Sequence, residues 1–201
     1  MYMSLVCGFI TLYLGRLSFP LFAFLLTEGY VHTSNIKKYF GRLFIFALIS
    51  QIPFVIFRTF VGEGVWLNIM VTLILGLFAI VIFDKIENKL LAIPLVVIVI
   101  YLSGLIKVDY GWYGVLVIFL FYLLKSNKIL LTISYISVVL LHYYLMSRLN
   151  LESIYSILCA IFPIVIIWLY NGKEGRKMKY FYYFFYPVHL VIIDLIGYLV
   201  K

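Results

Sequence analysis

The chain has 201 residues, of which 66% are hydrophobic and only 12% are charged. A soluble domain is roughly half apolar and about a quarter charged, so this composition excludes an ordinary soluble domain and indicates an integral membrane protein. The net charge of +8 does not call for a nucleic-acid partner, because excess Lys and Arg are typical of the cytoplasmic loops of membrane proteins. We expect one domain over residues 1–201, with Cys7 and Cys159 as free thiols, since both lie within apolar runs.

Apolar runs separated by short polar turns predict an all-α fold, a polytopic membrane helix bundle of about eight to nine transmembrane helices. The first run is short, because at about 1.5 Å per residue it covers only ~20 Å. We therefore expect that the first helix is a partial span or that its front half is missing. The expected helices are 2–14, 17–32, 36–60, 65–83, 90–106, 112–124, 129–146, 153–170 and 180–200.

Lys and Arg are unevenly divided between alternate loops. Eleven lie in the loops after the second, fourth, sixth and eighth expected helices, and five lie on the other side. The positive-inside rule places the first set in the cytoplasm. This predicts a multi-pass protein of the cytoplasmic (inner) membrane, with Arg16 and Asp109 facing outward and Glu28 and His32 near the cytoplasmic leaflet.

Glu28 and His32 are the first candidate pair. An acid four residues before a histidine places both on one face of a helix, and charge inside a membrane points to function. The pair is either a base with its orienting partner, or part of a site for a polar head group. The alternative is that both residues are solvated at the interface, where they end the helix.

The last expected helix carries a second candidate group. Tyr182, Tyr186 and His189 fall on one face, and His189 lies ~13 Å into the span. Asp194 lies deeper, on another face. A histidine and a carboxylate in one span indicate function more often than packing.

Two other segments have open interpretations. Asn68, Thr72 and Gly76 share a helix face, which is typical of helix packing, and a ligand contact from Asn68 is the less favoured interpretation. The outer loop that contains Asp109 and Tyr113 is either a turn with an aromatic belt or a binding loop.

Arg16 and His142 are each interpreted first as interfacial residues. Arg16 is typical of a snorkelling arginine. His142 stands beside two tyrosines, and nothing in its surroundings indicates catalysis. The three histidines of the chain are too dispersed to predict a metal site, and the sequence contains neither a phosphate-binding glycine loop nor a G-x-S-x-G motif.

Five sequence segments resemble one membrane protein family, both in their amino-acid sequences and in their order along the chain. They are GRLSFPLFAFLLTEGYVHT at 15–33, RLFIFALISQIPF at 42–54, LNIMVTLILGL at 67–77, DYGWYGVL at 109–116 and FYYFFYPVHL at 181–190. Together they resemble the TraX family, the membrane proteins associated with conjugal transfer and pilin acetylation, over essentially the whole chain. That family is similar to a larger group of membrane acyltransferases that use cytoplasmic acyl-CoA. The resemblance implies acetyl transfer, in the founding case to the N-terminus of a pilin subunit.

Two departures from the family pattern stand out. Family members usually have an earlier first helix that ends in an Asp-His pair, whose histidine is the expected base, whereas this chain begins MYMSLVCGFITLYL. The family's serine-acidic-isoleucine-proline pattern is Ser50-Gln51-Ile52-Pro53 here, which removes a second carboxylate.

The resemblance implies acetyl-CoA as the acyl donor, no metal, and partners that are the lipid bilayer and a peptide or pilin-like acceptor. The donor's phosphates are expected at Lys37, Lys38 and Arg42. The catalytic candidates are Glu28, His32 and His189. The candidates for substrate binding are Arg16, Asn68, Asp109, Tyr113 and Tyr186.

Two alternatives remain open. A small transporter or permease would use Glu28, His189 and Asp194 as proton or substrate sites, although the inverted repeats and paired broken helices of transporters are not evident. A non-catalytic relative would only bind a peptide in the membrane.

Overall fold

The computed structural model is all-helical over the residues that it describes, which are 2–60, 62, 64–146, 151–173 and 179–199. Side chains are described for these residues except 2–14, 60, 151–152, 179–182, 196–197 and 199. The described helices are α1 (Tyr2–His32), α2 (Ile36–Phe60), α3 (Ile69–Lys85), α4 (Lys89–Leu105), α5 (Gly111–Leu123), α6 (Lys128–Leu145), α7 (Leu151–Ile161), α8 (Pro163–Leu169) and α9 (Lys179–Leu199).

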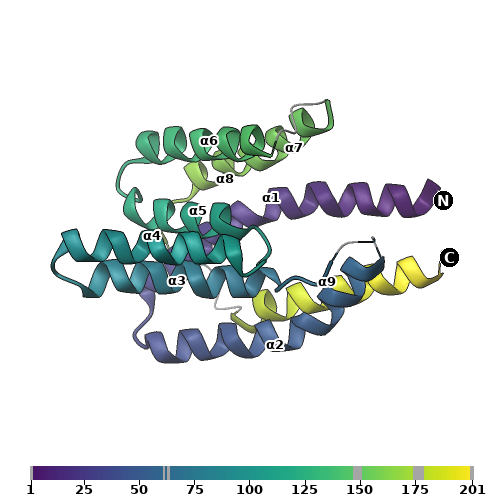
Figure 1. Cartoon of the computed structure of the whole chain (residues 1–201), viewed down its shortest axis with the longest axis horizontal. Coiled ribbons are helices and arrows are strands. Elements are labelled where there is room, and N and C mark those ends of the chain that lie inside the picture. The colour runs from purple at the N-terminus through teal and green to yellow at the C-terminus, as the bar shows by residue number, and fades with distance from the viewer. Residues whose placement is uncertain (1, 61, 63, 147–150, 174–178, 200–201) are drawn as a thin grey trace.

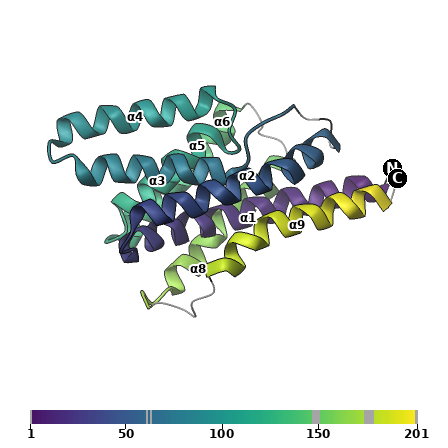
Figure 2. The ribbon, with the colours of Figure 1, turned by 90° about the horizontal axis from the view of Figure 1, so that it is seen from below.

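The helices run back and forth along the long axis of the molecule, and the start of α1 and the end of α9 lie at one end (Figures 1 and 2). The connections after α1, α3 and α5 lie toward the opposite end. The end of α8 belongs to this end too, since its carbonyls accept hydrogen bonds from Lys128 at the start of α6. We call it the basic end, after the lysines Lys37, Lys38, Lys85, Lys89, Lys125, Lys128 and Lys173.

The centre of the bundle is held by a close approach of α3 and α5. A Cβ atom on Gly76 would lie 2.5 Å from Ile118, and one on Gly114 would lie 2.6 Å from Thr72. Only glycine at these two positions lets the two backbones come so near. Asn68, Thr72 and Gly76 are all buried, which agrees with the packing interpretation of this helix face.

The outer surface is strongly apolar. Many large hydrophobic side chains are exposed, among them Leu90 at 83% and Ile52 at 71%, and soluble monomers rarely expose contiguous apolar surface on this scale. Two described helices, Ile36–Thr59 and Lys128–Leu145, are long and apolar enough to cross a bilayer. The all-helical prediction is confirmed, and the two apolar helices and the exposed apolar side chains are typical of a membrane protein. Eight to nine membrane crossings stay a prediction.

The predicted division between the first two helices is wrong. Runs 2–14 and 17–32 form the single helix α1, which has 31 residues and is about 46 Å long at 1.5 Å per residue. Gly15 and Arg16 do not break it, because a lone glycine is tolerated inside a helix and arginine is a good helix former. Arg16 therefore lies inside α1 rather than in a loop.

Two other predicted boundaries differ from the structure. The run 153–170 is interrupted at Phe162, where Pro163 lacks the N–H group that would continue the helical ladder and begins α8. The fourth run begins at Ile69 instead of residue 65, because Leu67 pairs in extended conformation with Val108. This pairing fixes the 106–110 loop against the start of α3.

Candidate functional site

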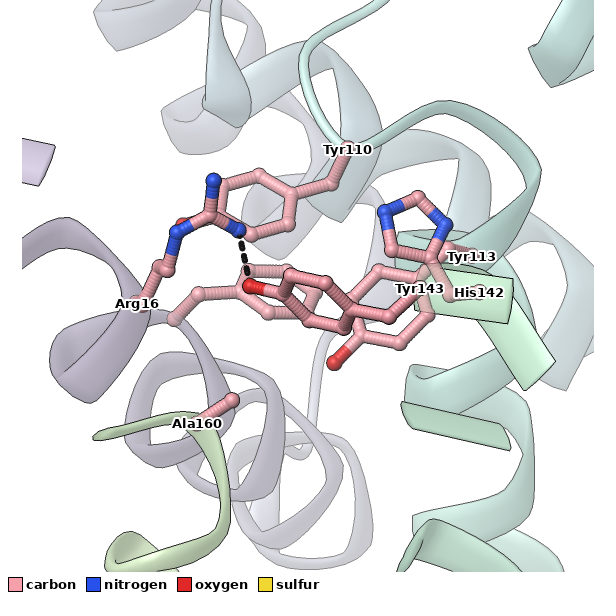
Figure 3. Close-up of a pocket in the computed structure, with 7 residues that line it drawn as sticks. Arg16, Tyr110, Tyr113, His142, Tyr143 and Ala160 are labelled. Atoms are coloured by element: carbon pink, nitrogen blue, oxygen red, sulfur yellow. Dashed lines mark hydrogen bonds between the residues drawn. The ribbon is translucent and has the colours of Figure 1, made fainter. Parts of the chain in front are cut away.

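A small polar pocket lies among the aromatic side chains of α1, α5 and α6 (Figure 3). Its volume is about 20 Å³, roughly what a single water-sized group requires. We call it the Arg16 pocket. It is lined by Arg16, Phe19, Tyr110, Tyr113, His142, Tyr143 and Ala160.

The loop before α5 brings Tyr110 into this pocket. Lys107 and Tyr110 both have positive φ angles, of 51° and 62°, which are uncommon for residues other than glycine. The conformation is held by hydrogen bonds on both sides: the Asp109 N–H donates to the Leu67 carbonyl at 2.8 Å, and the Thr72 hydroxyl donates to the Asp109 carbonyl. As a result, the Tyr110 ring stacks on Phe19 with 4.0 Å between ring centroids.

Arg16 is the cation of the pocket. Its Nη1 donates a hydrogen bond of 2.5 Å to the Tyr143 hydroxyl, and its guanidinium carbon lies 5.4 Å from the centre of the Tyr143 ring. Its Nε is buried and has no hydrogen-bond partner among the described residues. No carboxylate is among the described contacts of Arg16, so its N–H groups could still bind an anionic oxygen.

His142 lies on the other side of the pocket. Its ring stacks on Tyr113 with 4.5 Å between ring centroids, and the Trp112 ring lies edge-on to it with 5.7 Å between centroids. Figure 3 shows His142 and Tyr143 entering from α6 while Arg16 enters from α1. An imidazole is the commonest general base in enzymes, so this pocket combines a possible base with donors for an oxyanion.

His142 is not among the candidates taken from the sequence, although its position beside a buried helix face was readable there. Leu131, Tyr135, Val139 and Tyr143 recur every four residues along α6, and all four are buried. This spacing is typical of one buried helix face, and His142 borders it. The structure places His142 against the wall of the Arg16 pocket, half-buried at the edge of this face.

A larger cavity lies at the basic end. Its volume is about 470 Å³, and we call it the Glu28 cavity. Lys128 anchors one wall, because its ammonium group donates to the carbonyls of Trp168 at 3.0 Å and Tyr170 at 3.3 Å. The lining residues are Phe24, Glu28, Lys125, Lys128, Leu131, Ile167, Trp168, Tyr170, Asn171 and Gly172.

The predicted catalytic residues do not meet at one place. Glu28 is half-buried in its cavity, while the exposed ring of His32 is hydrogen-bonded to the Glu28 backbone carbonyl at 2.9 Å. His189 is half-buried on α9, and its Nδ1 lies 3.1 Å from the Phe185 carbonyl oxygen. Glu28 and His32 thus lie on α1, and His189 lies on α9. The catalytic roles of these three residues remain predictions.

The three predicted phosphate-binding residues lie at the start of α2. Lys37 and Lys38 are exposed, and the Lys38 N–H is hydrogen-bonded to the Asn35 side chain at 3.0 Å. Arg42 is half-buried, with its guanidinium 5.6 Å from the centre of the Tyr39 ring. None of the three lines the Glu28 cavity.

Asn68 has a structural role in the described contacts. It caps α3, since its side-chain oxygen accepts from the Met70 N–H at 2.9 Å. Its amide nitrogen donates to the Ala47 carbonyl at 2.7 Å and to Gln51 at 2.9 Å, which ties α2 to α3. Both N–H groups and the oxygen of the Asn68 amide are engaged, so the predicted substrate contact receives no support here.

The other predicted residues are dispersed. Tyr186 is buried on α9, whereas Tyr113 lies in the Arg16 pocket. Cys159 is a free thiol, while the side chains of Cys7 and Tyr182 lie outside the described part of the chain. Among the described residues, no three His, Cys, Asp or Glu side chains converge in an arrangement that could hold a metal ion.

Comparison with known proteins gives two matches. The family model described as "TraX protein" matches residues 3–197. The "Probable fimbrial assembly protein FimC, serogroup H1" of Dichelobacter nodosus is 30% identical over 203 residues, which cover 90% of this chain and 80% of that protein. No solved structure matches the chain significantly.

Proposed function

This chain belongs to the TraX family, and on this premise we propose that it is a multi-pass membrane acetyltransferase. It transfers an acetyl group from acetyl-CoA to a peptide N-terminus or another membrane-associated acceptor. The observation that supports this most strongly is the Arg16 pocket, where an arginine without a described carboxylate contact and a tyrosine hydroxyl lie beside an imidazole.

The reaction assigns a role to each of these groups. The acceptor nitrogen attacks the thioester carbon, its proton passes to His142, and the carbonyl oxygen becomes an oxyanion. Arg16 and the Tyr143 hydroxyl stabilise that oxyanion through hydrogen bonds. The carbon–sulfur bond then breaks, His142 returns the proton to the sulfur, and coenzyme A leaves as a thiol. The pocket has space for about one small polar group, which suits a single oxygen.

The basic end is placed in the cytoplasm of the cell, so that acetyl-CoA reaches the protein from that side. The uneven distribution of Lys and Arg supports this orientation. The exposed apolar side chains of α2, α4 and α6 face lipid and support several membrane crossings.

A second candidate function follows from the name of the relative in Dichelobacter nodosus, which describes a fimbrial assembly protein. In this role the chain would hold a pilin-like peptide in the membrane without reacting with it. Consumption of acetyl-CoA separates the two functions, because an assembly factor would leave the thioester intact.

The test uses the purified protein in lipid nanodiscs with radiolabelled acetyl-CoA and a peptide that has a free N-terminus. Each histidine is replaced in turn, as His142→Gln, His32→Gln and His189→Gln, and the thermal midpoint of each variant is matched to the parent. We expect His142→Gln to lower acetyl transfer by about a hundredfold or more, as for the loss of a general base, and the other two to retain most activity. Loss of activity only in His32→Gln or His189→Gln would place the chemistry elsewhere. No thioester consumption by the parent would favour the assembly role.

A further inference from the structure

We propose that the Glu28 cavity binds the nucleotide part of the acyl donor, with Lys125 as a phosphate contact and Trp168 as an aromatic surface for the base. This inference rests on the proposed function, because it gives the donor of that reaction a binding site. It replaces the expectation that Lys37, Lys38 and Arg42 meet the phosphates.

Size is the first argument. Ligand-binding cavities commonly have volumes of about 300–1,000 Å³, and the Glu28 cavity has about 470 Å³. The Arg16 pocket, at about 20 Å³, is too small for a nucleotide. The two sites can therefore divide the donor between them, with the nucleotide in the cavity and the reacting carbonyl in the pocket.

The charges in the cavity are the second argument. Two lysines and one carboxylate, Glu28, line the cavity, so its ionisable side chains carry a small excess of positive charge. The ammonium group of Lys125 lies 4.9 Å from the centre of the Tyr122 ring, and no carboxylate is among its described contacts. A lysine in this position is suited to a phosphate, which it binds as a point charge. Lys128 differs, because its ammonium group already holds the carbonyls at the end of α8.

The aromatic wall is the third argument. The indole N–H of Trp168 donates to the Thr132 hydroxyl at 2.8 Å, so the ring is fixed by α6 as well as by its own helix. Nucleic-acid bases stack favourably on such rings in single-strand binding proteins. An indole and a lysine in one cavity suit an anion that also carries a base.

The position of the cavity along α1 is the last argument. Glu28 lies in the cavity and Arg16 in the pocket, and the two residues are ~18 Å apart along the same helix. A donor held by its nucleotide at the basic end would need an extended acyl arm parallel to α1 to present its thioester at Arg16. Coenzyme A has such an arm between its nucleotide and its thiol.

Equilibrium binding of radiolabelled acetyl-CoA to the full chain in phosphatidylcholine nanodiscs tests this inference without requiring catalysis. We expect Lys125→Gln and Trp168→Leu each to raise the Kd by about tenfold or more, and Lys125→Gln also to weaken the dependence of binding on salt. The matched control is the double variant Lys37→Gln with Lys38→Gln, at the same end of the molecule, which should bind like the parent.

The opposite result, in which only the double variant binds weakly, would overturn the inference, as would a parent that does not bind acetyl-CoA. If Lys125→Gln instead changes retention of phosphatidylglycerol and leaves acetyl-CoA binding unchanged, the cavity is a lipid site and the inference also fails. If the parent binds acetyl-CoA but transfers no acetyl group, the proposed function fails and the binding site in the cavity stands. If Lys125→Gln and Trp168→Leu transfer acetyl groups and bind acetyl-CoA with the Kd of the parent, the binding site in the cavity fails and the proposed function stands.

Discussion

At the scale of single residues, Arg16 has the most unusual environment. It lies inside α1, and its described contact is the neutral Tyr143 rather than a carboxylate. A cation among apolar and aromatic side chains is costly in the interior of a bundle, and such residues are by default candidates for function in membrane proteins. Tyr143 keeps the guanidinium in position by accepting its hydrogen bond, and in the proposed reaction its own O–H group also donates to the oxyanion.

The adjacent tyrosines of α6 provide a matched test of this role. Tyr143→Phe removes the hydrogen bond to Arg16, whereas Tyr144→Phe alters an exposed side chain. A hydrogen bond to a charged group contributes about 1.5–3 kcal/mol, so kcat for acetyl transfer should fall by about tenfold or more in Tyr143→Phe only. The KM for acetyl-CoA should stay constant, because the proposed nucleotide site is the Glu28 cavity and not the Arg16 pocket. Equal kcat values in the two variants would contradict the role of Tyr143.

Two residues of this pocket, Arg16 and Tyr113, are among the substrate-binding candidates of the sequence analysis. On their own, Arg16 was interpreted first as an interfacial residue, and the loop of Tyr113 was left open between a turn with an aromatic belt and a binding loop. The contact between Arg16 and Tyr143 was not predictable, because it joins residues 127 positions apart. Only the packing of α6 against the rest of the bundle shows that His142 lies beside them.

At the scale of the elements, the connection between α2 and α3 depends on a buried amide network. Asn68 is fully buried, and its side chain makes hydrogen bonds to Ala47, Gln51 and Met70. Gln51 also donates a hydrogen bond of 2.7 Å to the Trp66 carbonyl. The glutamine that departs from the family pattern is thus used to fix the start of α3. A buried polar group that loses its partners costs about 1–3 kcal/mol.

Two helix-capping asparagines allow this cost to be measured. Asn68 caps α3 inside the bundle, and Asn88 caps α4 at the surface. Asn68→Ala should destabilise the protein by about 2–3 kcal/mol, because it leaves buried groups of α2 and α3 without partners. Asn88→Ala should cost about 1 kcal/mol. The measurement is the thermal midpoint in detergent, and equal shifts would show that the network adds nothing beyond capping.

The predicted elements were correct as apolar helical runs and wrong at particular boundaries. Gly15 with Arg16 resembled a turn, yet a lone glycine and an arginine are tolerated inside a helix, and α1 continues through them while Arg16 finds a partner in Tyr143. The break at Pro163 has a clear chemical signal in the sequence, but the long apolar run around it concealed the signal. Hydropathy locates apolar segments and does not show where a polar side chain will find an internal partner.

At the scale of the whole molecule, the lysines of four connections lie at one end, and both terminal helices have their free ends at the other (Figure 1). The all-helical class followed from composition. The packing order did not, because lipid-facing and core-facing sides are both apolar in a membrane helix. Periodicity therefore could not show that α1 contacts α5 and α7, or that α2 contacts α9.

Labelling of single cysteines tests the proposed orientation. Ser126 and Lys107 are exposed in the connections before α6 and α5, and Cys7 and Cys159 are first replaced by serine. Val108, by contrast, is 0% exposed and is unsuitable for labelling. In intact cells, a membrane-impermeant maleimide should react with Lys107→Cys and not with Ser126→Cys. Reaction of both positions from the same side would contradict the topology.

The central claim is that acetyl-CoA is used from the side of the basic end. It is tested by acetyl transfer in sealed vesicles of both orientations that contain the full chain and labelled acetyl-CoA outside. Incorporation into membrane products should occur in inverted vesicles, where the basic end faces outward, and should be absent from right-side-out vesicles and from Arg16→Ala in either orientation. No incorporation above vesicles that lack the protein, or equal incorporation in both orientations, would contradict the account.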